Sequence, residues 1–460
     1  MTRAIAFVTV LLLTAAGAAL LYQATARQRD YRAALTRGDN ALRDDQSFAA
    51  IEAYSGAIEL HPDSMLAYLR RGQTYRRRGD RGDLDAAARD FRKAAALDPA
   101  AIAPLEALGD VNYQLDRYGR AADAFERAIA LDDRSARISH KLGLARYRDG
   151  DVDAALDAVS RTVRLDERQA DAHYLLGMCL REKGRPTEAM RAFERALALA
   201  PGLVAARDEL ADLYGAHGRR TDQIEQLQVL AALDPARVER QVAVAMAHAQ
   251  AGHWDLAVLT LGSALERHHN DPLIYRALGQ IWLERPRDDA AFLSKAREAL
   301  ERAASSPAAP SDLLTLYARA LLDEGAVADG ERALEQAITR FPVEPSAFLL
   351  YAAVAEKQNH LTPARNALIA YGTLIRPDTN AVSRAVQIAA LSLRLNDVPT
   401  AVEWLTQATA ASPNDPLLLA SLADAQFRNG DRTGAQATIA RGLDRDPKNA
   451  QLAVLARRIR

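Results

Sequence analysis

The chain has 460 residues, of which 26% are charged, and its formal net charge is −1 at pH 7. This balance gives no support for nucleic-acid binding, which calls for an excess of basic side chains on one face. The single cysteine, Cys179, excludes an internal disulfide framework and any metal site built from several cysteines. We interpret Cys179 as a buried, small apolar residue and not as a reactive thiol.

The first predicted element is an apolar segment. Residues 4–22 carry no charge and follow Arg3, and their length is about that of one bilayer crossing. We interpret residues 1–30 as a membrane anchor. The alternative is a cleaved signal peptide, because residues 24–26 (Ala-Thr-Ala) resemble a cleavage site.

The orientation of this segment has two interpretations. Arg27, Arg29, Arg32 and Arg37 follow it, and the positive-inside rule then favours a cytoplasmic location for the rest of the chain. The short Arg-bearing start and the cleavage-like site favour export. We favour a single-pass anchor with the rest of the chain in the periplasm, and a cytoplasmic location is the alternative.

From residue 31 to residue 449 a pattern with a usual step of 34 residues fills the chain. Eight of its eleven steps are 34 residues long, and a fixed period of this length is typical of a repeat array. We number the repeats one to twelve by the Gly or Ala that opens the pattern: Gly38, Gly72, Gly109, Gly143, Gly177, Ala211, Ala245, Gly279, Ala318, Ala352, Ala389 and Ala423.

Each repeat is predicted to form two helices. A second small residue usually follows the first by twelve positions, a large apolar residue comes four positions later, and Ala is usual three beyond that. These spacings place small, large and small side chains on one face of the second helix. The large residues are Tyr54, Phe91, Phe125, Val159, Phe193, Leu227, Leu261, Leu300, Leu334, Leu368, Leu405 and Ile439.

This pattern resembles the tetratricopeptide repeat (TPR) family over about nine tenths of the chain. The resemblance implies an all-α, right-handed superhelical solenoid of about twelve helix-turn-helix repeats over residues 31–449. Residues 450–460 are expected to form an amphipathic helix that caps the array. The clearest repeat carries the family's characteristic residues at Gly177, Ala189, Phe193, Ala196 and Pro201.

Three places depart from the regular step. Extra residues lie around 78–84 in repeat two and around 285–293 in repeat eight. We expect both to enlarge the turn between the two helices and to project from one edge. Residues 377–381 lengthen the link between repeats ten and eleven.

The sequence holds no nucleotide-binding loop, serine-hydrolase elbow or zinc-protease motif. Its nine histidines are scattered, and the pair His268-His269 lies at a predicted turn without a third ligand at suitable spacing. We therefore predict that the protein is not an enzyme and has no catalytic residues, metal, cofactor or small-molecule substrate.

The resemblance implies that partners bind on the concave face, at positions 2, 5, 9, 12 and 13 of the first helices. In repeats two to five these positions include Asp110, Gln114 and Leu144 and are rich in the residue types that contribute most to interfaces. The alternative is a solvated face. Asn is absent from position 9 of every repeat, so the family's Lys and Asn clamp for chaperone carboxyl termini is missing. The predicted partner-binding residues are Gln73, Arg76, Arg77, Tyr113, Arg137, His140, Tyr147, Arg148, Tyr174, Met178 and Arg181.

These features predict a non-enzymatic scaffold or adaptor at a bacterial cell envelope, which binds unknown protein partners during assembly, secretion or polysaccharide export. One alternative is a membrane-anchored regulatory adaptor of envelope biosynthesis that faces the cytoplasm. Such an adaptor is similar to TPR regulators of lipopolysaccharide synthesis, but this chain lacks their Cys-rich tail. Another alternative is a non-catalytic subunit of an enzyme complex.

Overall fold

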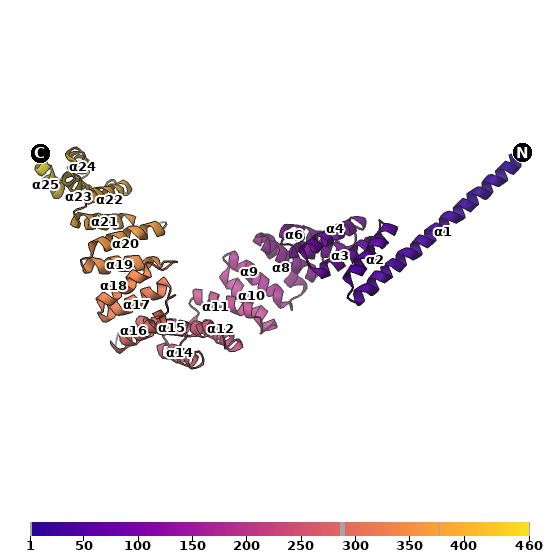
Figure 1. Cartoon of the computed structure of the whole chain (residues 1–460), viewed down its shortest axis with the longest axis horizontal. Helices are drawn as coiled ribbons and strands as arrows, with labels where there is room; N and C mark the ends of the chain where they lie inside the picture. Colours follow the sequence, from indigo (N-terminus) through magenta and orange to yellow (C-terminus); the bar gives the residue numbers. More distant parts are fainter. Residues whose placement is uncertain (1, 286–289, 377, 460) are drawn as a thin grey trace. The chain divides into compact units, whose positions relative to one another are not determined.

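The computed structural model describes the backbone of residues 2–285, 290–376 and 378–459, and the side chains of residues 17–285, 291–376 and 378–459. Every element in these ranges is an α-helix. Contacts divide the chain into two compact units, Met1–Gln226 and Leu227–Arg460, which are described separately (Figure 1).

The N-terminal unit contains the helices α1 (Thr2–Arg43), α2 (Ser47–Leu60), α3 (Met65–Arg78), α4 (Arg81–Leu97), α5 (Ile102–Gln114), α6 (Tyr118–Leu131), α7 (Ala136–Arg148), α8 (Val152–Leu165), α9 (Ala170–Glu182), α10 (Pro186–Leu199) and α11 (Val204–Ala216). The two units divide within α12 (Arg220–Leu233), after Gln226.

The C-terminal unit contains α13 (Val238–Gln250), α14 (Trp254–Arg267), α15 (Pro272–Glu284), α16 (Ala290–Ala304), α17 (Ser311–Glu324), α18 (Val327–Ala337), α19 (Pro345–Lys357), α20 (Leu361–Leu374), α21 (Ala381–Arg394), α22 (Val398–Ala411), α23 (Pro416–Arg428), α24 (Arg432–Arg445) and α25 (Ala450–Ile459).

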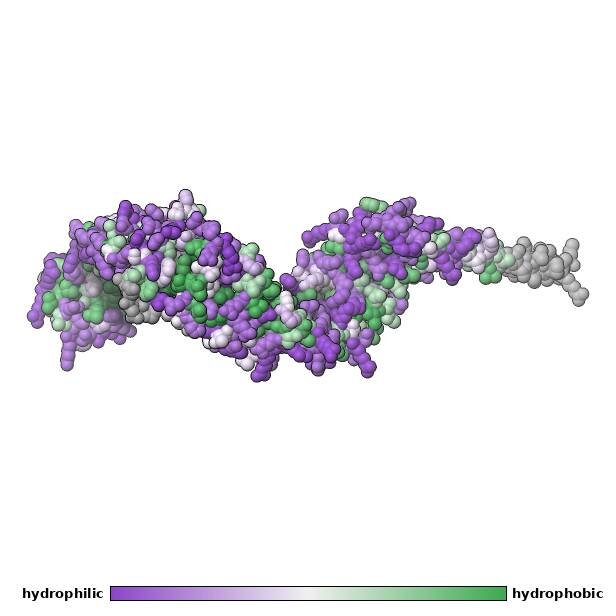
Figure 2. All heavy atoms as spheres, turned by 90° about the horizontal axis from the view of Figure 1, so that it is seen from below, coloured by the Kyte–Doolittle hydropathy of each residue, from purple (hydrophilic) through white to green (hydrophobic). Residues whose placement is uncertain are grey.

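Both units are built from pairs of helices joined by short turns. In the N-terminal unit α3 packs on α4, α5 on α6 and α7 on α8, and each pair also contacts the next. The same order holds in the C-terminal unit from α13 to α24. On the face shown in Figure 2, hydrophilic residues cover most of the surface and hydrophobic residues show in patches between them. The predicted all-α array of helix pairs is confirmed, and the handedness of its superhelix stays a prediction.

The large residue of the second helix packs directly on the small residue of the first. Four repeats combine Gly with an aromatic ring, and a Cβ on any of these glycines would lie 2.3–2.7 Å from that ring. Such a distance is shorter than any real carbon contact, so the ring occupies the space that a side chain would need. The four pairs are Gly38 with Tyr54, Gly72 with Phe91, Gly109 with Phe125 and Gly177 with Phe193.

Repeats that begin with Ala use a smaller, aliphatic partner. Ala245 shares a buried cluster with Leu261, and Ala318 shares one with Leu334. In these repeats the methyl group of Ala occupies part of the space that an aromatic ring fills beside Gly, as close packing requires.

The turn between the two helices of a repeat relies on one residue in the left-handed conformation. Gly150 has φ +86° between α7 and α8, and the side chain of Asp151 accepts a hydrogen bond from the Ala154 backbone N–H at 3.1 Å. Asp116 takes the same left-handed place between α5 and α6, with φ 56°. The helix therefore ends and the next begins within two or three residues.

The prediction of an enlarged turn in repeat two is wrong. Helix α4 has 17 residues, whereas α6 has 14, and only Gly79 and Asp80 separate α3 from α4. The extra residues extend α4. Asp83 lies in the first turn of this helix and forms an ion pair with Arg78 at 3.1 Å. Its negative charge is also favourable near the N-terminus of a helix. The corresponding extra residues of repeat eight fall mainly on 286–289, outside the described residues. The link between α20 and α21 spans residues 375–380.

Helix α1 runs unbroken through the predicted boundary between residues 30 and 31. Its last part belongs to repeat one, because Ala34 is buried and the Tyr31 hydroxyl lies 2.6 Å from Ser64 Oγ. Among the residues whose side chains the structure describes, no helix is long and apolar enough to cross a membrane. The predicted span, residues 4–22, falls mainly on residues 2–16, whose side chains lie outside the described part, so the anchor stays a prediction.

The last helix, α25, lies against α23 and α24. Its apolar residues Leu452, Leu455 and Ile459 are buried in one cluster with Ala423 and Ile439. This helix therefore covers the apolar face that the twelfth pair of helices leaves open.

Candidate partner-binding site

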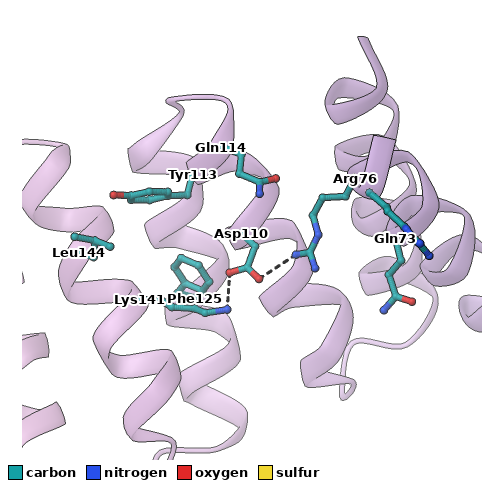
Figure 3. A pocket seen from close by; sticks show the side chains of 9 residues that line it. Gln73, Arg76, Asp110, Tyr113, Gln114, Phe125, Lys141 and Leu144 are labelled. Atoms are coloured by element: carbon teal, nitrogen blue, oxygen red, sulfur yellow. Dashed lines mark hydrogen bonds and ion pairs between the residues drawn. The ribbon is translucent and has the colours of Figure 1, made fainter. Parts of the chain in front are cut away.

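The first helices of repeats two, three and four form a cleft of about 480 Å³. We call it the α3–α5–α7 cleft, and Figure 3 shows it from close by. Its size lies within the range of small-ligand and side-chain pockets, roughly 300–1,000 Å³. It is lined by Gln73, Arg76, Arg77, Asp110, Tyr113, Gln114, Phe125, Lys141 and Leu144.

The floor of the cleft is apolar. Phe125 comes from α6, behind the other lining residues, and its ring reaches the cleft because Gly109 in front of it has no side chain. Leu144 lies beside it on α7, and Tyr113 on α5 points toward Leu144 (Figure 3). The Tyr113 ring is held edge to face against Tyr118, with centroids 5.2 Å apart. Phe125 is almost fully buried, so the accessible apolar surface comes mainly from Leu144 and Tyr113.

The rim of the cleft is an ion-pair network that joins three repeats. The Arg76 guanidinium on α3 donates to Asp110 Oδ2 at 3.0 Å, and Lys141 Nζ on α7 donates to Asp110 Oδ1 at 2.6 Å (Figure 3). Lys141 also donates to Glu106 Oε1 at 2.8 Å, and Arg137 donates to Glu106 Oε2 at 2.7 Å. Each carboxylate on α5 therefore binds cations from two side chains, which sets the three helices in register.

Arg77 lies at the edge of the cleft and turns toward repeat one. Its guanidinium donates to Asp45 at 2.9 Å and to the Leu42 carbonyl at 3.3 Å. Both charged side chains are more than half exposed, so this pair contributes little to stability.

Of the eleven predicted binding residues, four line this cleft: Gln73, Arg76, Arg77 and Tyr113. Arg137 joins its rim network through Glu106. The structure thus brings part of the predicted set together in one place.

The six other predicted residues lie farther along α7 and α9, outside the cleft lining. The Tyr147 hydroxyl donates to Glu182 at 3.1 Å, and Arg181 pairs with Glu209. Tyr174 packs its ring against Phe193, with centroids 5.8 Å apart. The remaining three residues are His140, Arg148 and Met178: His140 is partly buried, Arg148 is exposed, and Met178 packs against the core around Phe193.

Burial alters the acid–base properties of several of these groups. Desolvation lowers the pKa of His140, which keeps the imidazole neutral at pH 7. Desolvation and the carboxylate of Glu182 raise the pKa of Tyr147 to about 12. Burial also raises the pKa of the Cys179 thiol to about 12, and Cys179 is fully buried, which agrees with the packing role predicted for it.

Sequence reasoning missed Lys141 and Phe125 as cleft residues. The positions taken from the family resemblance did not include the position of Lys141, and Phe125 was assigned to packing alone. A signal existed for Phe125, because the earlier residue of the same repeat that faces it, Gly109, has no side chain to separate the ring from the α5 face. Of the four rings that pack on a Gly, Phe125 is the one that lines this cleft.

The cleft holds cations, amides and an apolar floor, which are groups that bind other molecules. Among the described residues, no group of three or more His, Cys, Asp or Glu side chains could hold a metal ion. The arrangement makes the cleft a candidate binding surface.

Comparisons with solved structures gave partial matches. The crystal structure of MamA is 29% identical over 35% of this chain and 93% of that chain, with a TM-score of 0.34. The structure of YrrB, titled a TPR protein with an unusual peptide-binding site, is 25% identical over 42% of this chain and 97% of that chain, with a TM-score of 0.37. PilF of Pseudomonas aeruginosa is 19% identical over 47% of this chain and 97% of that chain, with a TM-score of 0.38. No similar sequence was found among curated proteins.

Family models match more of the chain than these three structures do. One tetratricopeptide repeat model matches residues 35–80, 76–136, 140–204, 243–309 and 316–372, and a second matches residues 392–459. Together these ranges cover well over half of the sequence, and they fall on the helix pairs described above. The protein therefore belongs to the tetratricopeptide repeat family, whose members bind other proteins.

Proposed function

We propose that this protein is a non-enzymatic scaffold that binds a protein partner in the α3–α5–α7 cleft. The observation that carries the proposal is the combination found there: an apolar floor of Phe125, Leu144 and Tyr113 beneath a charged rim, on helices of three successive repeats. Apolar anchors ringed by polar groups are typical of sites where a few side chains supply most of the binding free energy.

A photo-crosslinking experiment tests this proposal. A photoreactive phenylalanine analogue replaces Leu144 in the cleft, and in a control protein it replaces Leu131, which is 44% exposed at the end of α6. We expect a discrete crosslinked adduct with another protein from position 144 and not from position 131. Equal adducts from both positions, or none from position 144, would contradict the proposal.

We further propose that the scaffold works at a bacterial cell envelope, anchored by residues 4–22 with its repeats in the periplasm. The uncharged segment after Arg3 supports the anchor, and the cleavage-like residues 24–26 support export. The alternative is a regulatory adaptor of envelope biosynthesis that faces the cytoplasm, supported by the four arginines after the segment.

A reporter separates the two orientations. Alkaline phosphatase, which is active only after export, is fused after Arg460 and compared with a fluorescent protein that matures only in the cytoplasm. Phosphatase activity without fluorescence is the expected result. The reverse pattern would replace the periplasmic proposal with the cytoplasmic alternative.

A further inference from the structure

A second cleft lies on another side of α7. It has a volume of about 770 Å³ and is lined by residues of α6, α7 and α8, and we call it the α6–α7–α8 cleft. Ser139 and Leu142 of α7 line it, whereas Lys141 and Leu144 of α7 line the α3–α5–α7 cleft. Residues three apart share one face of a helix, and these two pairs lie on different faces. The two clefts share none of the lining residues that the structure describes.

A serine stands in this cleft where most repeats carry a larger side chain. Ser139 lies four residues before Gly143, the small residue that opens repeat four. In repeats two to twelve the same place is small only at Ser139 and Ala385, and Trp404 packs against Ala385 in repeat eleven. Ser139 Oγ has no hydrogen-bond partner among the described residues, so no hydrogen bond within that part of the chain accounts for a serine there.

Repeat eight shows what fills the equivalent space. The cleft between α14, α15 and α16 has a volume of only about 190 Å³. Tyr275 of α15 lines it and stands at the place of Ser139. A phenol ring therefore occupies in repeat eight the place that Ser139 leaves open in repeat four. The apolar linings of the two clefts also correspond along the repeat: Ile129 to Leu265, Leu142 to Leu278 and Ala158 to Ala299.

The arginine that contacts this ring has a counterpart in repeat four. The Arg302 guanidinium lies 5.5 Å from the Tyr275 ring centroid and donates to the Tyr275 hydroxyl at 3.2 Å. Arg161 stands at the place of Arg302, six residues after the small residue of the second helix, and lines the α6–α7–α8 cleft. Its only ion pair among the described residues is with Asp133 at 3.7 Å, and both side chains are more than a third exposed. Arg161 is therefore loosely held and available to a ring.

The charges around the α6–α7–α8 cleft do not select a charged ligand. Its floor is apolar, and the cations and carboxylates of its lining balance in number. A neutral ring that packs on an apolar floor and meets a guanidinium fits this arrangement better than an ion does. The six charged lining residues are Arg134, Arg161, Arg164, Glu126, Asp133 and Asp157.

We propose that the α6–α7–α8 cleft binds an aromatic side chain of a second protein partner. The ring packs on Leu142 and Ala158 and lies against Arg161, as the Tyr275 ring lies against Arg302. Cation–π attraction of this kind is strongest where water is excluded.

The cleft is open enough for a peptide to carry the ring into it, since Arg134 and Arg164 in its lining are exposed. The proposal does not depend on the α3–α5–α7 cleft. The protein would then bind two partner segments, on two different sides of α7.

Disulfide tethering with the full-length protein tests the proposal. In a Cys179→Ala background, Arg164→Cys places the only thiol at the edge of the cleft. It is equilibrated in a partly reducing buffer with capped peptides that carry one Cys and, three residues later, Tyr, Leu or Gly. Mass spectrometry measures the fraction of protein that retains each peptide. The Tyr peptide should be retained about fivefold better than the Gly peptide and about twofold better than the Leu peptide.

Three variants decide where the ring binds. Ser139→Tyr should remove the preference for Tyr, because its own ring then fills the cleft as Tyr275 does in repeat eight. Arg161→Gln should reduce the preference about two- to threefold. Ala198→Cys is the matched control for residue 164 in repeat five, where His173 stands at the place of Ser139, and it should show no preference. Circular dichroism checks that each variant keeps its helicity.

A reciprocal variant creates the site in repeat eight. Tyr275→Ser removes the ring, and Ser305→Cys places a thiol at the position that corresponds to residue 164. A preference for Tyr should appear at residue 305 only after Tyr275→Ser. Damage to the fold cannot produce such a gain, and Ser139→Tyr decides the question alone if Tyr275→Ser loses helicity.

Several results would overturn the proposal. Equal retention of the three peptides at residue 164 is one, and a preference for Tyr that survives Ser139→Tyr is another. If the peptides show no preference but free p-cresol slows labelling at residue 164, the occupant is a small aromatic molecule and not a protein. Self-association that Ser139→Tyr abolishes would make a second copy of the chain the occupant. Crosslinking at position 144 is independent of all these outcomes, so the proposed function stands or fails separately.

Discussion

The ring of Phe125 lies so close to the backbone of Gly109 that a Cβ at residue 109 would stand 2.3 Å from Phe125 Cε1. The ring is 1% exposed and belongs to a buried cluster, so a Cβ at residue 109 would force it out of its packed position. The corresponding residue of the next repeat, Gly143, faces the smaller Val159, and a Cβ there would lie 3.4 Å from the nearest atom. A methyl group added at Gly109 would therefore clash with the ring of Phe125, whereas a methyl group added at Gly143 would meet no atom that close.

Gly109→Ala should destabilise the protein by about 1–2 kcal/mol, because overpacking outweighs the gain in helix propensity. Gly143→Ala should instead stabilise it by about 0.5–1 kcal/mol. Chemical unfolding and hydrogen exchange of amides in α5 and α7 measure both effects. Equal responses of the two variants would contradict the assigned packing.

Two arginines on α3 should differ strongly in their effect on stability. Arg71 donates two hydrogen bonds of 2.8 Å to Asp90, and Asp90 is 5% exposed. Arg71→Met leaves this buried carboxylate without its cation and should cost about 2–4 kcal/mol. Arg77→Met breaks an exposed pair with Asp45 and should change stability by less than about 0.5 kcal/mol. Urea unfolding followed by circular dichroism compares them, and similar midpoints would contradict this ranking.

Two buried serines provide a further comparison. Ser139 and Ser311 are each 1% exposed, but Ser139 Oγ has no hydrogen-bond partner among the described residues. Ser311 Oγ accepts a hydrogen bond of 2.9 Å from the Glu344 backbone N–H of the next repeat. Ser139→Ala should therefore be neutral or stabilising by about 1 kcal/mol, whereas Ser311→Ala should cost about 1–2 kcal/mol. Thermal unfolding of both variants measures the difference, and a loss of stability from Ser139→Ala would reveal an unrecognised partner.

The Cys179 thiol should be inert in the folded protein. Burial raises its pKa to about 12, so the reactive thiolate is scarce at pH 8. A disulfide reagent should modify it only after denaturant is added. Rapid modification of the native protein would contradict its burial.

The same raised pKa predicts how stability depends on pH. The unfolded thiol loses its proton near pH 9, whereas the folded thiol keeps it until about pH 12. The stability that the protonated thiol contributes is complete below pH 9 and is lost as the pH rises through this window. Cys179→Ala should therefore lose less stability than the wild type between pH 9 and pH 12, as measured by urea unfolding at each pH. Identical pH profiles would contradict this assignment.

Much of the fold could be predicted because each repeat contacts mainly its neighbours. The spacing of Gly177, Ala189 and Phe193 specifies a helix pair from local periodicity alone. The extra residues of repeat two were misjudged because length alone does not distinguish a longer turn from a longer helix. The charge pair of Arg78 and Asp83 across the short turn accompanies the longer helix.

The candidate site was harder to predict. Arg76 and Tyr113 were found because the repeat places them on the first-helix face. Lys141 was not, because its role depends on reaching Asp110 and Glu106 on the neighbouring repeat. Such a contact joins residues more than thirty positions apart, and sequence periodicity does not state which side chains meet.

The sequence by itself determined the repeat, its helix pairs and the buried small and large residues, since these depend on spacing within about 34 residues. Only the tertiary structure decided where the cleft lies and what charge it carries. The reason is that a cleft forms where side chains from three repeats come together, and its charge depends on how Arg76, Lys141 and Asp110 pair across them.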